Sequence, residues 1–349
     1  MKSRILSGVF ILCFGLLMQC KKDQPPQNSS SGSITSSKRL LICNEGNFGL
    51  GNGSISVYDP VSGNVVTDAY RTANNNQYIG DVLESYSRFE GKYYWAVNNS
   101  GKVVITDLNF VRLSSVSGFI SPRYIEVVGN NKAYVSNLQL NLQLPNYIQI
   151  IDLNQNAITG TIRIDGWTEQ MAQSYGKVFI TNVYKKYLYV VDASSDAVVD
   201  SIFLNAGSNC IIKDQNEKIW VACDTSAGNS SRLVRINPVS HQIELDLSLH
   251  STQSSISRME INGSGSTIYY LMNDLYKFGI TQTAVPTASF ILQSGRTFYG
   301  LGIDPYDETI YVSDAINFNQ SGVVYRYKSD GTAVANFHAG IIPGNMTVE

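Results

Sequence analysis

The fold is decided by residues 168–204, which read TEQMAQSYGKVFITNVYKKYLYVVDASSDAVVDSIFL. Short runs rich in Val, Ile, Tyr and Thr alternate there with clusters of Gly, Asp, Ser and Asn, as in strands joined by tight turns. The pattern predicts four antiparallel strands, at 169–174, 177–181, 187–191 and 198–204. Four strands within about forty residues are typical of one blade of a β-propeller.

The same unit recurs along the whole chain. Each copy carries an apolar phrase that ends in a small residue, and the phrases begin at Leu41, Tyr94, Tyr134, Phe179, Trp220, Tyr269 and Tyr311. The first, innermost strand of each copy is expected to begin at Gly80, Pro122, Thr168, Ser208, Ser257, Phe298 and Pro343. A period of roughly 40 to 50 residues indicates stacked supersecondary units, here seven blades.

The two ends of the repeat region complete each other. It opens at Arg39 with a second strand that lacks a first strand, and it closes at 343–349 with a first strand that no blade follows. Joining the two would close the ring and leave no open sheet edge. We therefore expect an all-β fold, a seven-bladed β-propeller of four-stranded antiparallel blades over residues 39–349, closed by the C-terminal strand.

The N-terminus has the features of a lipoprotein signal peptide over residues 1–19. Lys2 and Arg4 precede an apolar stretch too short to span a membrane, and Cys20 follows as the expected lipidated residue. Gln19 is an uncommon residue before such a cysteine, and an ordinary cleaved signal is the alternative. The polar composition of residues 20–38 predicts a flexible tether.

The amino-acid composition excludes some classes of binding partner. The formal net charge is −2 and basic residues form only small clusters, so no nucleic-acid partner is expected. No long apolar stretch follows residue 20, so we expect membrane contact through the lipid anchor alone. Cys43, Cys210 and Cys223 lie in apolar strand contexts and are expected to be buried thiols, with a Cys210–Cys223 bridge as the alternative.

No pattern of catalytic residues stands out. His241, His250 and His338 are dispersed, and the spacings typical of zinc sites, phosphate-binding loops and serine hydrolases are missing from the sequence. We therefore expect a non-enzyme without a cofactor or a metal. Catalysis by carboxylates near the channel, as in some propellers, is the alternative.

Function should lie where the repeat is irregular. The residue after each innermost-strand start varies from blade to blade, and this ring consists of Asp81, Arg123, Glu169, Asn209, Arg258, Tyr299 and Gly344. These residues should surround the channel on one face. They either bind a ligand or seal the channel through ion pairs, Arg123 with Asp81 or Arg258 with Glu169.

Loops on the same face add aromatic and amide groups. The predicted ligand-binding residues there are Asn44, Glu45, Asn47, Phe48, Asn98, Trp167, Asn182, Tyr184 and Asp314. The apolar 138–147 loop belongs to the same set. Aromatic rings beside amides suit a bulky polar ligand, because the rings cover its faces and the amides bond its edges. The alternative for each Asn is to cap a turn through its side chain.

Several phrases resemble a known family. YVSN at 134–137 and FITN at 179–182 are similar to the YVTN-repeat, or YncE-like, seven-bladed propellers. NEGNFG at 44–49, SPRY at 121–124 and the lipoprotein start resemble propeller lipoproteins of Bacteroidetes-type outer membranes, which include the BtuG-type surface proteins that capture cobalamin.

The resemblance implies a monomeric propeller, lipid-anchored in the outer membrane and facing the cell surface or the periplasm. It also implies a corrinoid ligand that is passed to an outer-membrane transporter. A glycan-like ligand, a protein–protein interaction scaffold, and a propeller lyase or lactone hydrolase are the alternatives.

Overall fold

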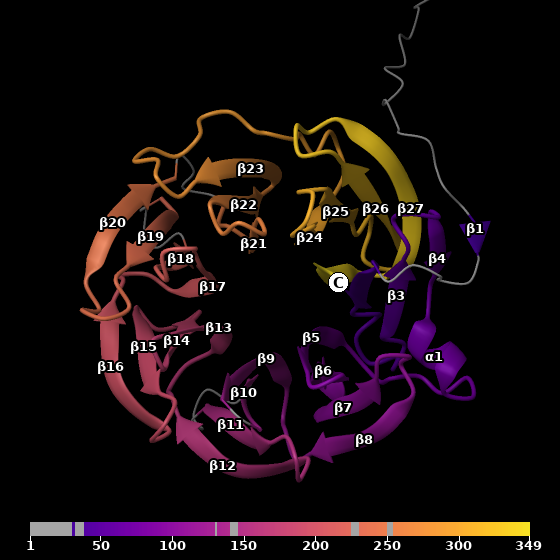
Figure 1. Cartoon of the computed structure of the whole chain (residues 1–349), viewed down its shortest axis with the longest axis horizontal. Helices are drawn as coiled ribbons and strands as arrows, with labels where there is room; N and C mark the ends of the chain where they lie inside the picture. Colours follow the sequence, from indigo (N-terminus) through magenta and orange to yellow (C-terminus); the bar gives the residue numbers. More distant parts are fainter. Residues whose placement is uncertain (1–29, 32–37, 130, 140–145, 225–229, 250–253) are drawn as a thin grey trace, which may run out of the picture.

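The computed structural model describes residues 30–31, 38–129, 131–139, 146–224, 230–249 and 254–349. Its strands form seven sheets arranged side by side around a central axis (Figure 1). The expected seven-bladed β-propeller is therefore confirmed. The expected signal peptide, Cys20 and most of the expected tether lie outside the described residues, as do positions 140–145 of the 138–147 loop and His250.

The blades are numbered here in chain order, and their strands are given from the channel outward. Blade one consists of β28 Pro343–Val348, β2 Leu40–Asn44, β3 Ser54–Tyr58, β4 Asn64–Val66 and β1 Ser30–Ser31. Blade two consists of β5 Leu83–Phe89, β6 Lys92–Val97, β7 Lys102–Asp107 and β8 Arg112–Ser117. Blade three consists of β9 Pro122–Gly129, β10 Lys132–Asn137, β11 Tyr147–Asp152 and β12 Ala157–Arg163.

The remaining blades follow the same order. Blade four consists of β13 Thr168–Ser174, β14 Lys177–Asn182, β15 Tyr187–Asp192 and β16 Ala197–Phe203. Blade five consists of β17 Ser208–Lys213, β18 Ile219–Cys223, β19 Arg232–Ile236 and β20 Ile243–Ser248. Blade six has β21 Arg258–Ile261, β22 Thr267–Met272 and β23 Asp274–Gly279, and blade seven has β24 Phe298–Ile303, β25 Ile310–Asp314, β26 Ser321–Tyr327 and β27 Ala333–Ile341. The described helices are short, α1 Ala69–Ala73 and η1 Asn98–Ser100.

The ring closes as expected. Strand β28 pairs antiparallel with β2, with Leu40 opposite Val348 and Ile42 opposite Met346. The backbone N–H groups of Arg39 and Glu349 each donate to the carbonyl oxygen of the other residue, both at 2.9 Å. The last strand of the chain is thus the innermost strand of the first blade, near the centre of Figure 1.

The repeated phrase forms the second strand of each blade and is almost wholly buried. Tyr134, Val135, Phe179 and Ile180 are fully inaccessible to solvent. Because neighbouring blades cover both faces of these strands, the phrase is continuously apolar rather than alternating. The predicted strands of blade four agree with the structure to within one residue at each end.

The repeated Asp and Asn residues close the hairpins on the face opposite the starts of the innermost strands. The Oδ1 atom of Asp59 accepts from the N–H of Val61 at 2.8 Å, and the Oδ1 of Asp192 accepts from Ser194 N–H at 2.9 Å. Asn237 does the same for Val239 at 2.9 Å. These side chains satisfy backbone donors of the turn, which is why the position repeats.

Two blades differ from the four-stranded pattern. In blade six, the described sheet has three strands, and residues 281–296 touch its outer edge through a bridge between Leu275 and Ile291. Pro286 lies in that segment, and proline cannot donate to a sheet ladder. In blade one, Ser30–Ser31 of the expected tether adds a fifth strand, parallel to β4.

Cys43, Cys210 and Cys223 are buried and unpaired, so the expectation of buried thiols is confirmed and the alternative bridge is not formed. Within the described ranges, no helix has the length and apolar character needed to cross a membrane.

Candidate functional site at the channel mouth

Seven residues meet where the innermost strands begin, and we call them the mouth ring. Six occupy the second position of an innermost strand, and Arg258 begins β21. The mouth ring consists of Glu84, Arg123, Glu169, Asn209, Arg258, Tyr299 and Gly344. Six of these positions are those predicted from the repeat. The ring is irregular in charge and size. Three of its residues form a closed sector, and three others form an open sector together with Glu45 from an adjoining loop.

Asp81 is not in the mouth ring, so its predicted place there is wrong. The backbone at Val82 has a positive φ of 57°, and β5 begins only at Leu83, which makes Glu84 the equivalent of Arg123. Asp81 instead stabilises the adjoining loops. Its Oδ2 atom accepts from Gly49 N–H at 2.8 Å and from the amide of Asn99 at 2.6 Å.

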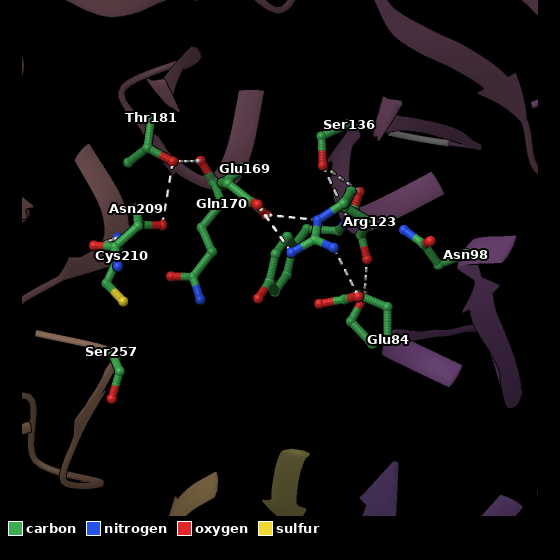
Figure 2. A network of polar contacts seen from close by, with 12 residues as sticks. Glu84, Asn98, Arg123, Ser136, Glu169, Gln170, Thr181, Asn209, Cys210 and Ser257 are labelled. Atoms are coloured by element: carbon green, nitrogen blue, oxygen red, sulfur yellow. Dashed lines mark hydrogen bonds and ion pairs between the residues drawn. The ribbon is translucent and has the colours of Figure 1, made fainter. Parts of the chain in front are cut away.

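The closed sector is formed by Glu84, Arg123 and Glu169. The guanidinium of Arg123 donates from Nη1 to Glu84 Oε2 at 3.0 Å, and from Nε to Glu169 Oε2 at 3.0 Å (Figure 2). Its Nη2 lies 2.9 Å from Glu169 Oε1, which makes that pair bidentate. Ion pairing does occur at the mouth, but the expected Arg123–Asp81 and Arg258–Glu169 pairs are wrong, because Glu84 lies on one side of Arg123 and Glu169 on the other.

Electrostatics favour the ionised form of Arg123. Burial lowers the pKa of Arg123, but the charges of Glu84 and Glu169 outweigh burial and raise it above the ordinary value. Burial raises the pKa of Glu169, and Arg123 offsets part of that rise. Trp167 covers the guanidinium, with the Arg123 Cζ 5.5 Å from the ring centroid. This sector is a satisfied network with little capacity left for a ligand.

The open sector is formed by Glu45, Arg258, Tyr299 and Gly344. The Tyr299 hydroxyl donates to Glu45 Oε1 at 2.6 Å, while the nearest approach of Arg258 Nη2 to that oxygen is 4.0 Å. Arg258 lies over the Tyr299 ring, 5.1 Å from its centroid, and donates to its neighbour Ser257 O at 3.2 Å. Arg258 therefore retains donors that no carboxylate holds at bidentate distance.

Gly344 is buried and lets the groups of this sector pack closely together. A β-carbon at Gly344 would lie 3.1 Å from Glu45 Oε1 and 3.7 Å from Arg258 Nη2. A glycine at this position therefore allows the Glu45 carboxyl and the Arg258 guanidinium to approach the innermost strand of blade one. Burial and the charge of Glu84 raise the pKa of Glu45 to about 7.

Aromatic side chains extend the open sector to the rim. Phe318 packs edge-on against Tyr299, with ring centroids 5.5 Å apart. Asn47 ties its own loop to that of Phe318, because its amide donates to Phe318 O at 3.1 Å. Beside Asn47, Phe48 is 75% exposed. A second aromatic pair, Trp167 with Tyr184, stands above the closed sector with centroids 5.4 Å apart.

A comparison with protein families identifies the chain at the family level. The model of a domain of unknown function, DUF5074, matches residues 38–340. The chain belongs to this family. No curated protein matches the sequence.

Solved structures share the fold of this DUF5074 propeller. A quinonprotein alcohol dehydrogenase-like protein from Bacteroides thetaiotaomicron is 16% identical, with a TM-score of 0.67 over 87% of this chain and 78% of that chain. AztD from Citrobacter koseri is 12% identical, with a TM-score of 0.58 over 89% and 97%. Hydrazine synthase from Kuenenia stuttgartiensis is 11% identical, with a TM-score of 0.56 over 73% and 85%. At these identities the likeness establishes the fold alone.

Other predicted site residues of the DUF5074 propeller have structural partners. Asn44 donates to Ser56 Oγ at 2.9 Å and accepts from Gly340 N–H at 3.1 Å. Asn182 accepts from Lys185 N–H at 2.9 Å, and Asp314 accepts from Thr297 N–H at 2.8 Å. The amide of Asn209 donates to the Ile256 carbonyl at 2.8 Å. For these residues the structure shows local capping and bracing of loops.

Asn98 also has a structural partner, although its hydrogen bond is longer than those of the residues above. It is buried, and its amide donates to the Pro122 carbonyl at 3.4 Å. The predicted residues that remain accessible at the rim are aromatic, namely Phe48 and Tyr184.

Glu84 and Tyr124 lie at the site but are not among the residues predicted from the sequence. Glu84 was hidden by the turn at Gly80–Val82, although the run from Val82 to Tyr86 already has strand character. Tyr124 follows Arg123 and faces the channel cavity, where burial raises its pKa and Arg258 opposes the rise. Across the described ranges, no group of three or more His, Cys, Asp or Glu is arranged to hold a metal ion.

Proposed function

We propose that the chain is a non-catalytic lipoprotein of the cell envelope that binds a bulky polar ligand at the channel mouth. The observation that carries this proposal is the open sector, where Arg258 lies over the Tyr299 ring and the exposed aromatic side chains of Phe48 and Phe318 lie on the adjoining loops. Flat apolar surface next to charged and hydroxyl groups is the combination expected for such a ligand.

A corrinoid is our first candidate ligand. It combines a large flat ring with several peripheral amides, so its faces can stack on Phe48 and Phe318 while its edges meet Arg258 and Glu45. The resemblance to BtuG-type propeller lipoproteins supports the same choice. A glycan-like ligand shares part of this chemistry, because sugar faces also stack on aromatic rings.

The remaining parts of the proposal rest on the sequence. A lipid on Cys20 would hold the propeller at the outer membrane, facing the cell surface or the periplasm, and the ligand would pass to an outer-membrane transporter. At the mouth we propose a binding role rather than catalysis, because the carboxylates there are engaged: Arg123 holds Glu84 and Glu169, and Tyr299 holds Glu45. A proton-transfer group usually needs a free position beside the reacting atom.

Titration of the purified protein with cyanocobalamin tests the ligand. We expect measurable heat and a raised melting temperature. The variant Phe48→Ala should bind at least about tenfold more weakly, because burying a Phe side chain contributes roughly 1.5–3 kcal/mol. Its melting temperature without ligand should be unchanged, since the ring is 75% exposed.

Tyr306→Ala is the matched control. Tyr306 is 78% exposed and lies in the turn between β24 and β25, on the face opposite the mouth ring. Its removal should leave the affinity unchanged. Absence of heat and of any thermal shift at high micromolar cyanocobalamin would rule out the corrinoid.

A further inference from the structure

A cavity of about 200 Å³ lies inside the channel, below the mouth ring. Five innermost strands line it, and the polar lining residues are Tyr124, Glu126, Gln170, Glu260 and Asn345. Figure 2 shows the side chain of Gln170 extending toward the open centre of the ring. Apolar side chains such as Met259 form part of the wall. The volume equals that of several water molecules, so a small organic molecule fits.

The two acids of this cavity occupy equivalent positions in their blades. Glu126 pairs with Tyr134 and Glu260 pairs with Tyr269, and both tyrosines are the first residue of the repeated phrase. The residues at the same position in the other blades are Ser87, Ala172, Ile212, Gly302 and Thr347. At this strand position, only blades three and six among the seven have an ionisable side chain. These two blades lie on opposite sides of the ring (Figure 1).

Neither acid is neutralised by a close cation. Within the described residues, Glu260 has no hydrogen-bond or ion-pair partner, and Arg258 acts on it only through space. The carboxyl group of Glu126 accepts a hydrogen bond from the backbone N–H of Gln173. Lys213 attracts it electrostatically from a distance, but the Lys213 ammonium group is paired with Glu217 at 2.9 Å. Burial accordingly raises the pKa of Glu126 to about 7 and that of Glu260 to about 8. A cation placed between them would replace the protons and restore the ionised carboxylates.

The available ligands favour an organic cation over a metal ion. The described residues offer no cluster of three or more metal-binding side chains, and the two carboxyls stand on blades three and six. An alkylammonium group needs only a few oxygen acceptors, which Glu126, Glu260 and the amide of Asn345 supply. Methylene groups between two ammonium ends would lie against Met259 and its apolar neighbours.

We propose that the channel cavity is a binding site for a short aliphatic diamine, with one ammonium group held by Glu126 and the other by Glu260. The site is separate from the ligand site proposed at the rim, and either can exist without the other. The mouth and the cavity together contain five carboxyl groups, those of Glu45, Glu84, Glu126, Glu169 and Glu260, against the guanidinium groups of Arg123 and Arg258. Full ionisation of these acids would leave an excess of negative charge, which a bound dication offsets.

Calorimetric titration of the purified protein with 1,4-diaminobutane tests the proposal. We expect saturable binding at pH 7.5 that releases protons, so the observed heat should change with the ionisation enthalpy of the buffer. The diamines with three and five methylene groups define the length preference. The uncharged 1,4-butanediol, which has the same chain length, should not bind.

Glu126→Gln and Glu260→Gln should each weaken diamine binding at least tenfold, and each should reduce the proton release. Glu90→Gln is the control, because Glu90 is exposed in the turn between β5 and β6 and does not line the cavity, so both quantities should be unchanged. Thermal melts of the four proteins show whether they are folded, and folded glutamine variants with wild-type affinity would overturn the proposal.

Two further results would also overturn it. One is the lack of binding by any of the diamines, whether or not calcium chloride binds, and the other is binding of 1,4-butanediol with the affinity of the diamine. Phe48→Ala should leave diamine binding intact, so failure of the rim site and failure of the cavity site are distinguishable.

Discussion

At the scale of single residues, the mouth depends on the partners of Arg123. Its side chain is 21% exposed, and those of Glu84 and Glu169 are 5% and 7% exposed. A buried ion pair contributes little compared with an apolar replacement, but removal of one partner leaves the others uncompensated. Arg123 therefore stabilises the folded state mainly because its positive charge compensates the two buried carboxylates of Glu84 and Glu169.

Arg123→Ala should lower the free energy of unfolding by about 3–5 kcal/mol at pH 8, measured by urea denaturation. The folded-state pKa of Glu169 is already raised above its unfolded value, and loss of Arg123 raises it further. The folded variant then binds more protons than the unfolded chain, so its stability should increase as the pH falls through that pKa. The deficit should shrink by pH 5.

Arg163→Ala is the control for this experiment. Arg163 pairs with Asp165 at 3.3 Å, and both side chains are more than half exposed, so a change below about 1 kcal/mol is expected. A loss in Arg123→Ala that is equally small, or independent of pH, would contradict the role of the buried network.

Residue positions at the mouth were only partly predictable from the sequence. Arg123, Glu169, Arg258 and Tyr299 follow from counting along the repeat, because the register shifts near the starts of β9, β13 and β24 recur from blade to blade and leave these strands beginning at the expected residues. Glu84 does not, because the positive φ at Val82 shifts the strand start and sequence periodicity does not reveal a single backbone dihedral. The pairing of Arg123 with Glu84 on one side and Glu169 on the other likewise depends on side-chain directions across three blades.

At the scale of elements, the blades pack so closely that some turns have no room for a side chain. Gly263 lies in the turn between β21 and β22, and a β-carbon there would be 1.7 Å from the carbonyl oxygen of Pro305 in blade seven. Strand positions are predictable from apolar runs, as blade four shows. The missing fourth strand of blade six is harder to predict, because a polar segment with one proline is compatible with either a weak strand or a loop.

Gly263→Ala should therefore destabilise the protein by about 1–3 kcal/mol, the usual cost of an overpacked site. Gly279→Ala in the same blade is the control, because the nearest atom to its β-carbon would be 3.7 Å away. Denaturant midpoints of both variants provide the comparison. Equal midpoints would show that the turns of blades six and seven can move apart without cost.

At the scale of the whole molecule, stability depends on the pairing of the chain ends. Met346 and Val348 of β28 pack in one buried cluster with Leu40 and Ile42 of β2. The side chain of Glu349 accepts hydrogen bonds from the hydroxyl groups of Tyr93 and Tyr86 in blade two. The closure of the ring was predictable from the sequence, because the repeat begins with a blade that lacks its first strand and ends with a first strand that lacks a blade. Pairing of these two segments completes one blade.

A chain that ends at Ile342 should therefore lose its cooperative thermal transition, and it should associate through the uncovered edge of β2. Size-exclusion chromatography with light scattering and thermal denaturation measure these effects. The full chain, analysed in parallel, should be monomeric. A monomeric truncated chain with an unchanged melting temperature would show that β28 is dispensable.

The backbone contact between Arg39 and Glu349 makes the covalent starting point of the propeller arbitrary. A short linker could join these two residues, and the chain could be opened in any exposed turn, giving circular permutants with the same ring of blades. New ends placed at the turn of Val61 or Val239 would lie on the face away from the channel mouth. The molecule could then be fused or immobilised through that face, with both proposed sites left accessible.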